Sequence, residues 1–228
     1  MPDKTAPAEE HSDVIPMFPT LVWKVQLQAG LRDAIDASVL PYITRLRKGS
    51  PPLAAGCGWQ SVQDLHTAAE FNDLVSCVNR AAAAVLRFLR IGRATCEITA
   101  CWVTILAPGA AHRMHSHPNN YLSAVYYLRT RPGADTINFH DPRSQAGIIR
   151  PPVTELTGEN TDQVVVRVQD GTLLLFPSYL RHSVDSNSSG EERISVSFNM
   201  MFSQFTEALT RPLWSPNEVP AQEASAQR

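Results

Sequence analysis

Apolar positions recur at helical spacing in the first half of the chain. Two segments, 31–46 and 67–89, carry apolar residues three or four positions apart, which indicates amphipathic helices. Pro41 predicts a kink or a division in the first of them, because proline lacks the amide donor that a helix interior needs. Thr67 and Glu70 have the spacing of a capping box, which predicts that the second helix begins at Thr67.

Alternation with a period of two residues, typical of strands, dominates from residue 97 onward. These segments are rich in β-branched and aromatic residues and are separated by Pro-Gly, Asp-Gly and Ser-Gly pairs. Together with one early segment, the expected strands are 17–27, 97–106, 122–128, 136–140, 164–168, 172–176 and 194–202. Helices first and many strands afterwards predict an α+β fold, in which an N-terminal helical layer packs on one face of a jelly-roll barrel.

Composition narrows the class of protein. The chain of 228 residues suits a single domain over 15–213, with a disordered tail at 1–14 and a loose tail at 214–228. A net charge of -2 gives no electrostatic footprint for nucleic acid. No apolar run approaches the roughly 20 residues that cross a bilayer, and the first residues lack a secretory leader, so we expect a cytoplasmic protein without a membrane partner. Exposed apolar residues on the helical layer would suit a homodimer.

Two histidines two residues apart, His115 and His117, precede the expected strand 122–128. Residues two apart in an extended chain point the same way, so both imidazoles can bind one metal ion such as Fe(II). His182 follows the strand 172–176 and can close the site from a neighbouring strand. The sequence therefore predicts a metal centre built on histidines.

Arg193 begins the last expected strand, and Ser195 shares its face. A guanidinium binds a carboxylate through two parallel hydrogen bonds, and a hydroxyl two residues on can add a third. This pair predicts an anion pocket beside the metal. His112 is expected outside the metal shell, and the remaining candidates for structural roles are His11, His66 and His140 as bystanders and Trp102 and Tyr126 as core residues.

These residues stand in motifs that resemble those of the 2-oxoglutarate/Fe(II)-dependent oxygenase family. The matching motifs are Phe-Pro-Thr-x-x-Trp at 18–23, His-x-His-Pro at 115–118, Ser-x-x-Tyr-Tyr at 123–127, Phe-x-Asp-Pro-Arg at 139–143, Gly-x-Leu-x-x-Phe-Pro-Ser-x-x-x-His at 171–182 and Glu-Arg-x-Ser-x-Ser-Phe-Asn at 192–199. The resemblance extends over about residues 17–205. It implies a double-stranded β-helix fold, Fe(II), and 2-oxoglutarate as co-substrate.

Residue by residue, the resemblance implies that His182 is the distal metal ligand. It also implies that Arg193 and Ser195 hold the far carboxylate of 2-oxoglutarate, where Tyr127 can add a hydroxyl. The wider superfamily carries His-x-Asp at its first motif, whereas this chain carries His115-Ser-His117. Either three histidines hold the metal or a carboxylate such as Asp141 enters from elsewhere. We favour three histidines, because Asp141 ends a different strand, before a proline.

The leading hypothesis is an oxygenase that uses O2 and hydroxylates an unactivated C–H of a small molecule or peptide, with release of succinate and CO2. One alternative is a cupin-like metalloenzyme that uses three histidines without 2-oxoglutarate. Another is a non-catalytic barrel that binds a carboxylate ligand. Loops on one scaffold vary freely, so the fold does not select the substrate.

Overall fold

The computed structural model describes residues 13–92, 96–143, 145 and 147–203. The tail predicted at 214–228 lies outside these residues, as does all but the end of the tail predicted at 1–14. None of the helices in these ranges is long and apolar enough to cross a bilayer.

Two long helices form one layer of the molecule. α1 (Ala29–Leu46) continues through Pro41, so the predicted division is wrong. α2 (Asn72–Phe88) starts five residues later than the capping-box spacing predicted. The Thr67 hydroxyl donates instead to the carbonyl of Asp64 within a short 3-10 turn, and the Glu70 carboxylate pairs with an arginine of α1.

Within the described residues, ten strands form two antiparallel sheets. The large sheet has the order β1-β8-β5-β10-β3-β2. Its strands are β1 (Trp23–Gln26), β2 (Gly58–Gln60), β3 (Cys96–Leu106), β5 (Leu122–Arg129), β8 (Thr172–Pro177) and β10 (Arg193–Phe202). The small sheet has the order β4-β9-β6-β7. Its strands are β4 (His112–His115), β6 (Thr136–His140), β7 (Gln163–Arg167) and β9 (His182–Val184).

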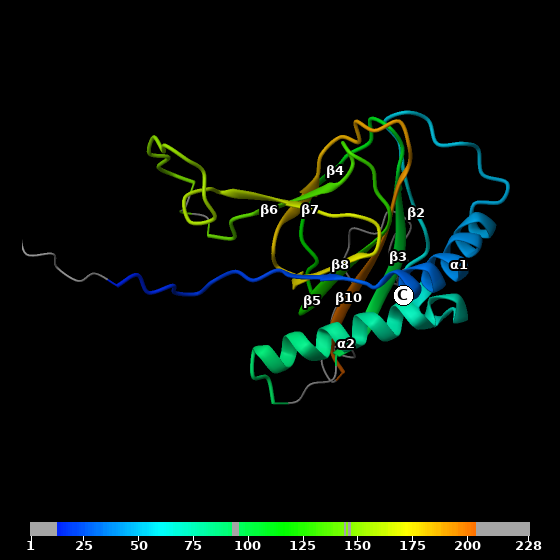
Figure 1. Ribbon diagram of the computed structural model, residues 1–228, viewed down its shortest axis with the longest axis horizontal. Coiled ribbons are helices and arrows are strands. Elements are labelled where there is room, and N and C mark those ends of the chain that lie inside the picture. The colour runs from blue at the N-terminus through cyan, green and yellow to red at the C-terminus, as the bar shows by residue number, and fades with distance from the viewer. Residues whose placement is uncertain (1–12, 93–95, 144, 146, 204–228) are drawn as a thin grey trace, which may run out of the picture.

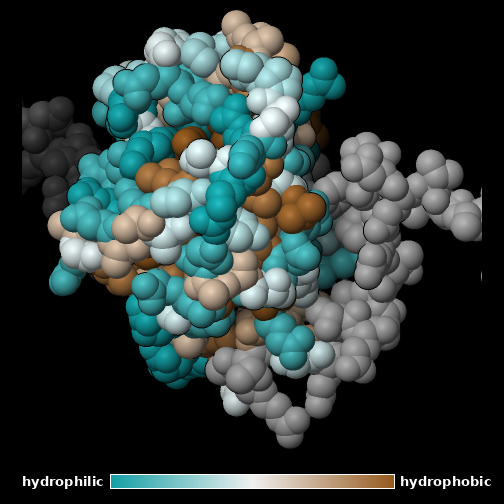
Figure 2. Space-filling view, turned by 90° about the vertical axis from the view of Figure 1, so that its right-hand side faces the viewer, coloured by the Kyte–Doolittle hydropathy of each residue, from teal (hydrophilic) through white to brown (hydrophobic). Residues whose placement is uncertain are grey.

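The sheets and helices are stacked as layers (Figure 1). α2 lies on one side of the large sheet, and β4, β6 and β7 lie on its other side. The predicted α+β fold with a helical layer on a jelly-roll barrel is thereby confirmed. Of the first predicted strand, 17–27, only the residues of β1 form a strand. Seen from the side of α1, the surface is mostly hydrophilic with separate hydrophobic patches (Figure 2).

Alternation along the central strands divides the core in two. Tyr126, Val196 and Phe198 belong to the cluster that joins the large sheet to the helices. Tyr127 belongs to the second cluster, between the two sheets. Because side chains alternate across a strand, Ser195 lies on the same face as Tyr127, its partner across β10 and β5. The two-residue period therefore sends a row of polar side chains into the space between the sheets.

Candidate metal centre and anion pocket

Three histidines from distant parts of the chain gather between the sheets. His115 ends β4 and lies opposite His182, the first residue of β9. His117 lies beyond the end of β4, where its backbone N–H donates to the carbonyl of Ser178 at 2.9 Å. One nitrogen of each imidazole lies within 4.8 Å of the others. His115 and His117 do point to one place, as predicted, but His117 lies two residues beyond the end of β4 rather than on the strand.

Backbone carbonyls fix the orientation of two of the rings. The Nδ1 atoms of His115 and His182 lie 2.8 Å and 2.9 Å from the carbonyl oxygens of Arg113 and Leu180. A carbonyl only accepts, so each Nδ1 carries the proton and donates it. The Nε2 atom of each ring is therefore left with a free lone pair, the form in which imidazole binds a metal ion.

The third ring is incompletely satisfied by protein groups. Nε2 of His117 lies 3.3 Å from Nε2 of His182, while Nδ1 of His117 is buried and makes no hydrogen bond within the described residues. Burial lowers the pKa of His117, and the nearby side chain of Asn199 opposes this only in part. A cation between the two Nε2 atoms would remove their mutual repulsion and leave Nδ1–H of His117 free to donate to Asn199. The donor set thus fits a metal ion that prefers imidazole.

Burial keeps these rings neutral. It is the main cause that lowers the pKa of both His117 and His182 to about 3, with His115 as the next cause. Burial also lowers the pKa of His115. Neutral imidazoles are the ligating form, so the site is ready for a metal ion at neutral pH.

Arg193 lies in the same cavity without an acidic partner. Its side chain is 3% exposed, and its Nε–H donates to the carbonyl of Ala134 at 3.1 Å. The guanidinium carbon lies 5.1 Å from the centre of the Tyr127 ring, a cation–π contact. No Asp or Glu of the described residues forms an ion pair with Arg193. A buried charge of this kind is strongly destabilising unless a ligand completes it.

Hydroxyl groups surround the guanidinium. Ser195 lies opposite both Tyr127 and Thr104 in the neighbouring strands, and all three line the cavity. The Tyr127 hydroxyl is buried without a hydrogen bond to any described residue. Burial raises the pKa of Tyr127 to about 12, so this hydroxyl stays protonated and can donate. These groups converge as donors for an anion.

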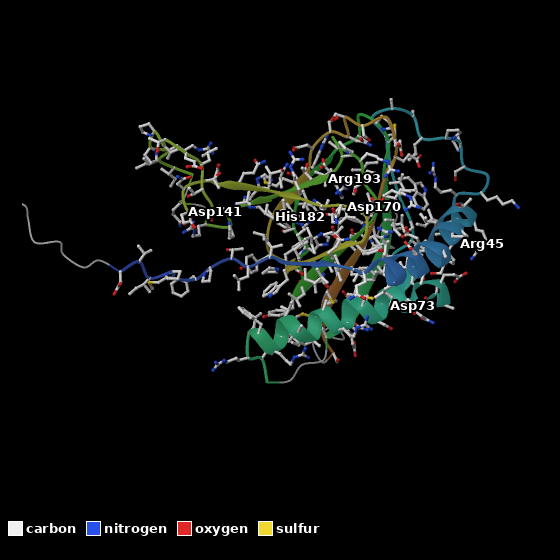
Figure 3. All side chains as sticks on the ribbon, in the orientation of Figure 1. Arg45, Asp73, Asp141, Asp170, His182 and Arg193 are labelled. Atoms are coloured by element: carbon white, nitrogen blue, oxygen red, sulfur yellow. The ribbon has the colours of Figure 1, made fainter. Side chains whose placement is uncertain are left out.

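One cavity, open to solvent, joins the two groups. The three histidines and the group formed by Arg193, Ser195 and Tyr127 line it together, and no carboxylate among the described residues does. Figure 3 places His182 and Arg193 in the space between the sheets. The arrangement can bind a metal ion and a small dianionic ligand side by side.

The other sequence candidates lie at different distances from the cavity. Asp141 lies farther out, where β6 ends (Figure 3), and its carboxylate binds the guanidinium of Arg143 at 2.7 Å. It is outside the histidine group. Nε2 of His140 lies 2.9 Å from the Ser183 hydroxyl, away from the cavity lining. Trp102 is buried as predicted, but its ring also stacks on His117 at a centroid distance of 5.6 Å.

Sequence reasoning missed the position of His112. Its ring stacks on that of His115 at 4.3 Å and lines the cavity, although its nitrogens are not in the metal-ligating group. In a regular strand, residues three apart face opposite sides. An irregularity of register between His112 and His115 turns both to one side, and the sequence pattern gives no signal for it.

Comparisons with known proteins agree with this architecture. Residues 100–199 match the model of the family described as "Putative 2OG-Fe(II) oxygenase". None of the curated proteins matches the sequence. Among solved structures, a prolyl-4-hydroxylase of Pseudomonas putida has a TM-score of 0.56 and 17% identity, covering 80% of this chain and 94% of that one.

Two Streptomyces proteins show a similar likeness. AviO1 of Streptomyces viridochromogenes has a TM-score of 0.59 and 14% identity, covering 85% of this chain and 93% of that one. HygX of Streptomyces hygroscopicus, solved with nickel and 2-oxoglutarate bound, has a TM-score of 0.57 and 14% identity, covering 82% of this chain and 85% of that one. At these identities the likeness is one of fold, and it confirms the expected double-stranded β-helix.

Proposed function

We infer that this chain, whose residues 100–199 match the model of the 2OG-Fe(II) oxygenase family, is an Fe(II)- and 2-oxoglutarate-dependent oxygenase. One observation carries the inference: a single cavity is lined by three neutral histidines and by a buried arginine that has no acidic partner within the described residues. Each half of this site is unsatisfied by protein groups, and the two halves suit a metal ion and a dicarboxylate.

We assign the metal to His115, His117 and His182. Their Nε2 atoms face one another, and the carbonyls behind His115 and His182 hold those two rings in place. Ferrous iron, when bound, supplies the O2 chemistry that couples the conversion of 2-oxoglutarate to succinate and CO2 to substrate oxidation. The protein supplies the ligand geometry and the orientation of the bound groups.

We assign the far carboxylate of 2-oxoglutarate to Arg193, Ser195 and Tyr127. The guanidinium donates in a planar fork. The Ser195 hydroxyl lies two residues along the same strand, β10, and the Tyr127 hydroxyl lies on the neighbouring strand β5. Val125 and Ile137 line the cavity with apolar surface, which strengthens these charge-assisted hydrogen bonds by excluding water. In a metalloenzyme that does not bind 2-oxoglutarate, the buried guanidinium would have no function.

We propose that the substrate is a small molecule or a peptide with an unactivated C–H, which the enzyme hydroxylates. A cytoplasmic location and a homodimer formed through the helical layer stay predictions.

The test is anaerobic addition of Fe(II) and 2-oxoglutarate to the purified protein. A visible metal-to-ligand charge-transfer band should appear only when both are present, and 2-oxoglutarate should bind the metal-loaded protein in calorimetry. The matched control is His182→Ala, which should show no band. Absence of both the band and the calorimetric signal in the unaltered protein would contradict the proposed function.

A further inference from the structure

His112 is a cavity residue that the assigned roles leave unused. It begins β4, opposite Val184 of β9, and its ring lies nearly parallel to that of His115, at 26°. It stands outside the group of three metal-ligating nitrogens. A stacked ring can orient its neighbour, but stacking requires no ring nitrogen.

The ring nitrogens of His112 make no hydrogen bond to any described residue, although the side chain is only partly exposed. A polar group that is withdrawn from water is normally hydrogen-bonded, to protein, to water or to a ligand. The cavity that His112 lines contains no carboxylate among the described residues that could accept its proton. Within the cavity, the hydrogen-bond partner of this imidazole is therefore water or a bound ligand.

The position of His112 places it next to both halves of the site. On one side its ring is in contact with His115, a candidate ligand of the metal. On the other side, Val184, its partner across the strands, packs in one small cluster with Leu106. Leu106 is in turn the cross-strand partner of Arg193. His112 therefore lines the same cavity as the histidine group and the guanidinium, within reach of a ligand that joins them.

We propose that His112 is a further co-substrate-binding residue, whose ring N–H donates a hydrogen bond to a carboxylate oxygen of 2-oxoglutarate. The inference rests on the proposed function, because that function supplies the ligand. In this role His112 adds a neutral donor to the charged donor of Arg193. His112 would thereby favour a ligand with a carboxylate at each end over a monocarboxylate that fills only half of the cavity.

The experiment separates stacking from hydrogen bonding with two substitutions. His112→Phe keeps an aromatic ring against His115 but has no donor, whereas His112→Gln keeps a donor without the ring. Fe(II) affinity is measured first without 2-oxoglutarate. Affinity for 2-oxoglutarate is then measured on the metal-loaded protein by anaerobic titration of the charge-transfer band and by calorimetry with Mn(II) in place of iron.

We expect His112→Phe to bind Fe(II) like the unaltered protein and to bind 2-oxoglutarate about tenfold more weakly or worse, the effect of one hydrogen bond to a charged group. His112→Gln should recover part of that loss. The matched control is His140→Gln, which changes a histidine outside the cavity and should leave 2-oxoglutarate affinity unchanged. If His112→Phe does not fold, His112→Leu takes its place in the same comparison.

Two results would overturn the proposal while the proposed function stands. Unchanged 2-oxoglutarate affinity in His112→Phe would leave only the stacking role, provided that Arg193→Ala loses binding in the same assay. Loss of Fe(II) affinity in His112→Phe equal to the loss of 2-oxoglutarate affinity would make His112 a support for the metal site. Failure of the unaltered protein to bind 2-oxoglutarate would remove the proposed function and this inference together.

Discussion

Replacing Arg193 by methionine tests the anion half of the site most directly. Arg193 is buried, makes one hydrogen bond to the Ala134 carbonyl, and lies over the Tyr127 ring. Methionine is long, flexible and apolar, so it can fill the same space and keep contact with the ring. The substitution removes the charge without opening a large cavity. We expect it to abolish 2-oxoglutarate binding and to spare metal binding.

The magnitude follows from the burial of the guanidinium. Truncating one partner of a buried, hydrogen-bonded charge pair costs about 2–5 kcal/mol of binding free energy, which weakens the dissociation constant by roughly thirtyfold to several thousandfold. The stability of the protein without 2-oxoglutarate should not fall with this substitution. An unpaired buried charge carries a desolvation cost of several kcal/mol, so Arg193→Met should be at least as stable as the unaltered protein when no 2-oxoglutarate is present.

Thermal unfolding of the Mn(II)-loaded protein gives the assay. At a concentration of 2-oxoglutarate about 100 times its dissociation constant, binding stabilises the unaltered protein by about 2.7 kcal/mol. For a domain of this size that corresponds to a rise of roughly 5–10 °C in Tm. Arg193→Met should lose about two thirds of this rise or more, and Arg193→Lys less, because an ammonium keeps the charge but lacks the planar fork.

The control for this assay is Arg131→Met. Arg131 forms ion pairs with Asp170 and Glu191 outside the cavity and is more than a third exposed, so its loss should leave the rise in Tm intact. The reasoning is refuted if Arg193→Met binds 2-oxoglutarate within about twofold of the unaltered protein, since a single hydrogen bond to a charged group is already worth more than that.

Three further predictions concern the metal and the scaffold. Alanine at any of the three candidate ligands should remove most of the Fe(II) affinity in equilibrium dialysis, whereas Asp141→Ala should retain it, because that carboxylate is bound to an arginine outside the histidine group. Tight Fe(II) binding in His117→Ala together with loss of binding in Asp141→Ala would reverse the assignment. The metal-free protein should lose stability between pH 7 and pH 5.5, by about 1 kcal/mol for each of His117 and His182, because the unfolded imidazole (pKa about 6.5) takes up a proton there and the folded ring (pKa about 3) does not. The loss continues toward pH 3, and urea unfolding that is flat over this range would contradict it. Gly133→Ala should lower Tm by several degrees, because Gly133 has φ 88° and an added Cβ would collide with the Ser188 side chain; an unchanged Tm would show that the loop relaxes.

Periodicity was sufficient to predict the layers of the fold and the anion half of the site. The alternation of Tyr126 and Tyr127 divides them between the two core clusters, and the same rule brings Arg193 and Ser195 to one face of β10. These strands are long and paired on both sides, so a local pattern and the tertiary structure agree. In the same way, Val78 and its apolar neighbours at helical spacing predicted the buried face of α2.

The metal half of the site depends on features too short for a pattern. β4 and β9 have four and three residues, and an irregularity within β4 turns His112 toward the cavity. His117 follows the strand and is held by the backbone carbonyl of Ser178, a contact between distant segments. The capping box failed for a related reason. The Thr67 hydroxyl donates to the Asp64 carbonyl instead of accepting from a backbone N–H of the helix, and local hydrogen bonds of this kind compete with helix formation.

The strands that carry the two halves of the site differ in length and in their position within the sheets. Arg193 belongs to a ten-residue strand with neighbours on both sides, whereas His115 ends a four-residue strand at the edge of the small sheet. Amide hydrogens in β10 should therefore exchange with solvent only in large openings of the domain, and those of β4 and β9 in small local ones. A metal ion that ties His115 and His117 to His182 will slow exchange in the two short strands and leave β10 unchanged. Solvent exchange thus reports metal occupancy on one wall of the cavity, with the other wall as its internal reference.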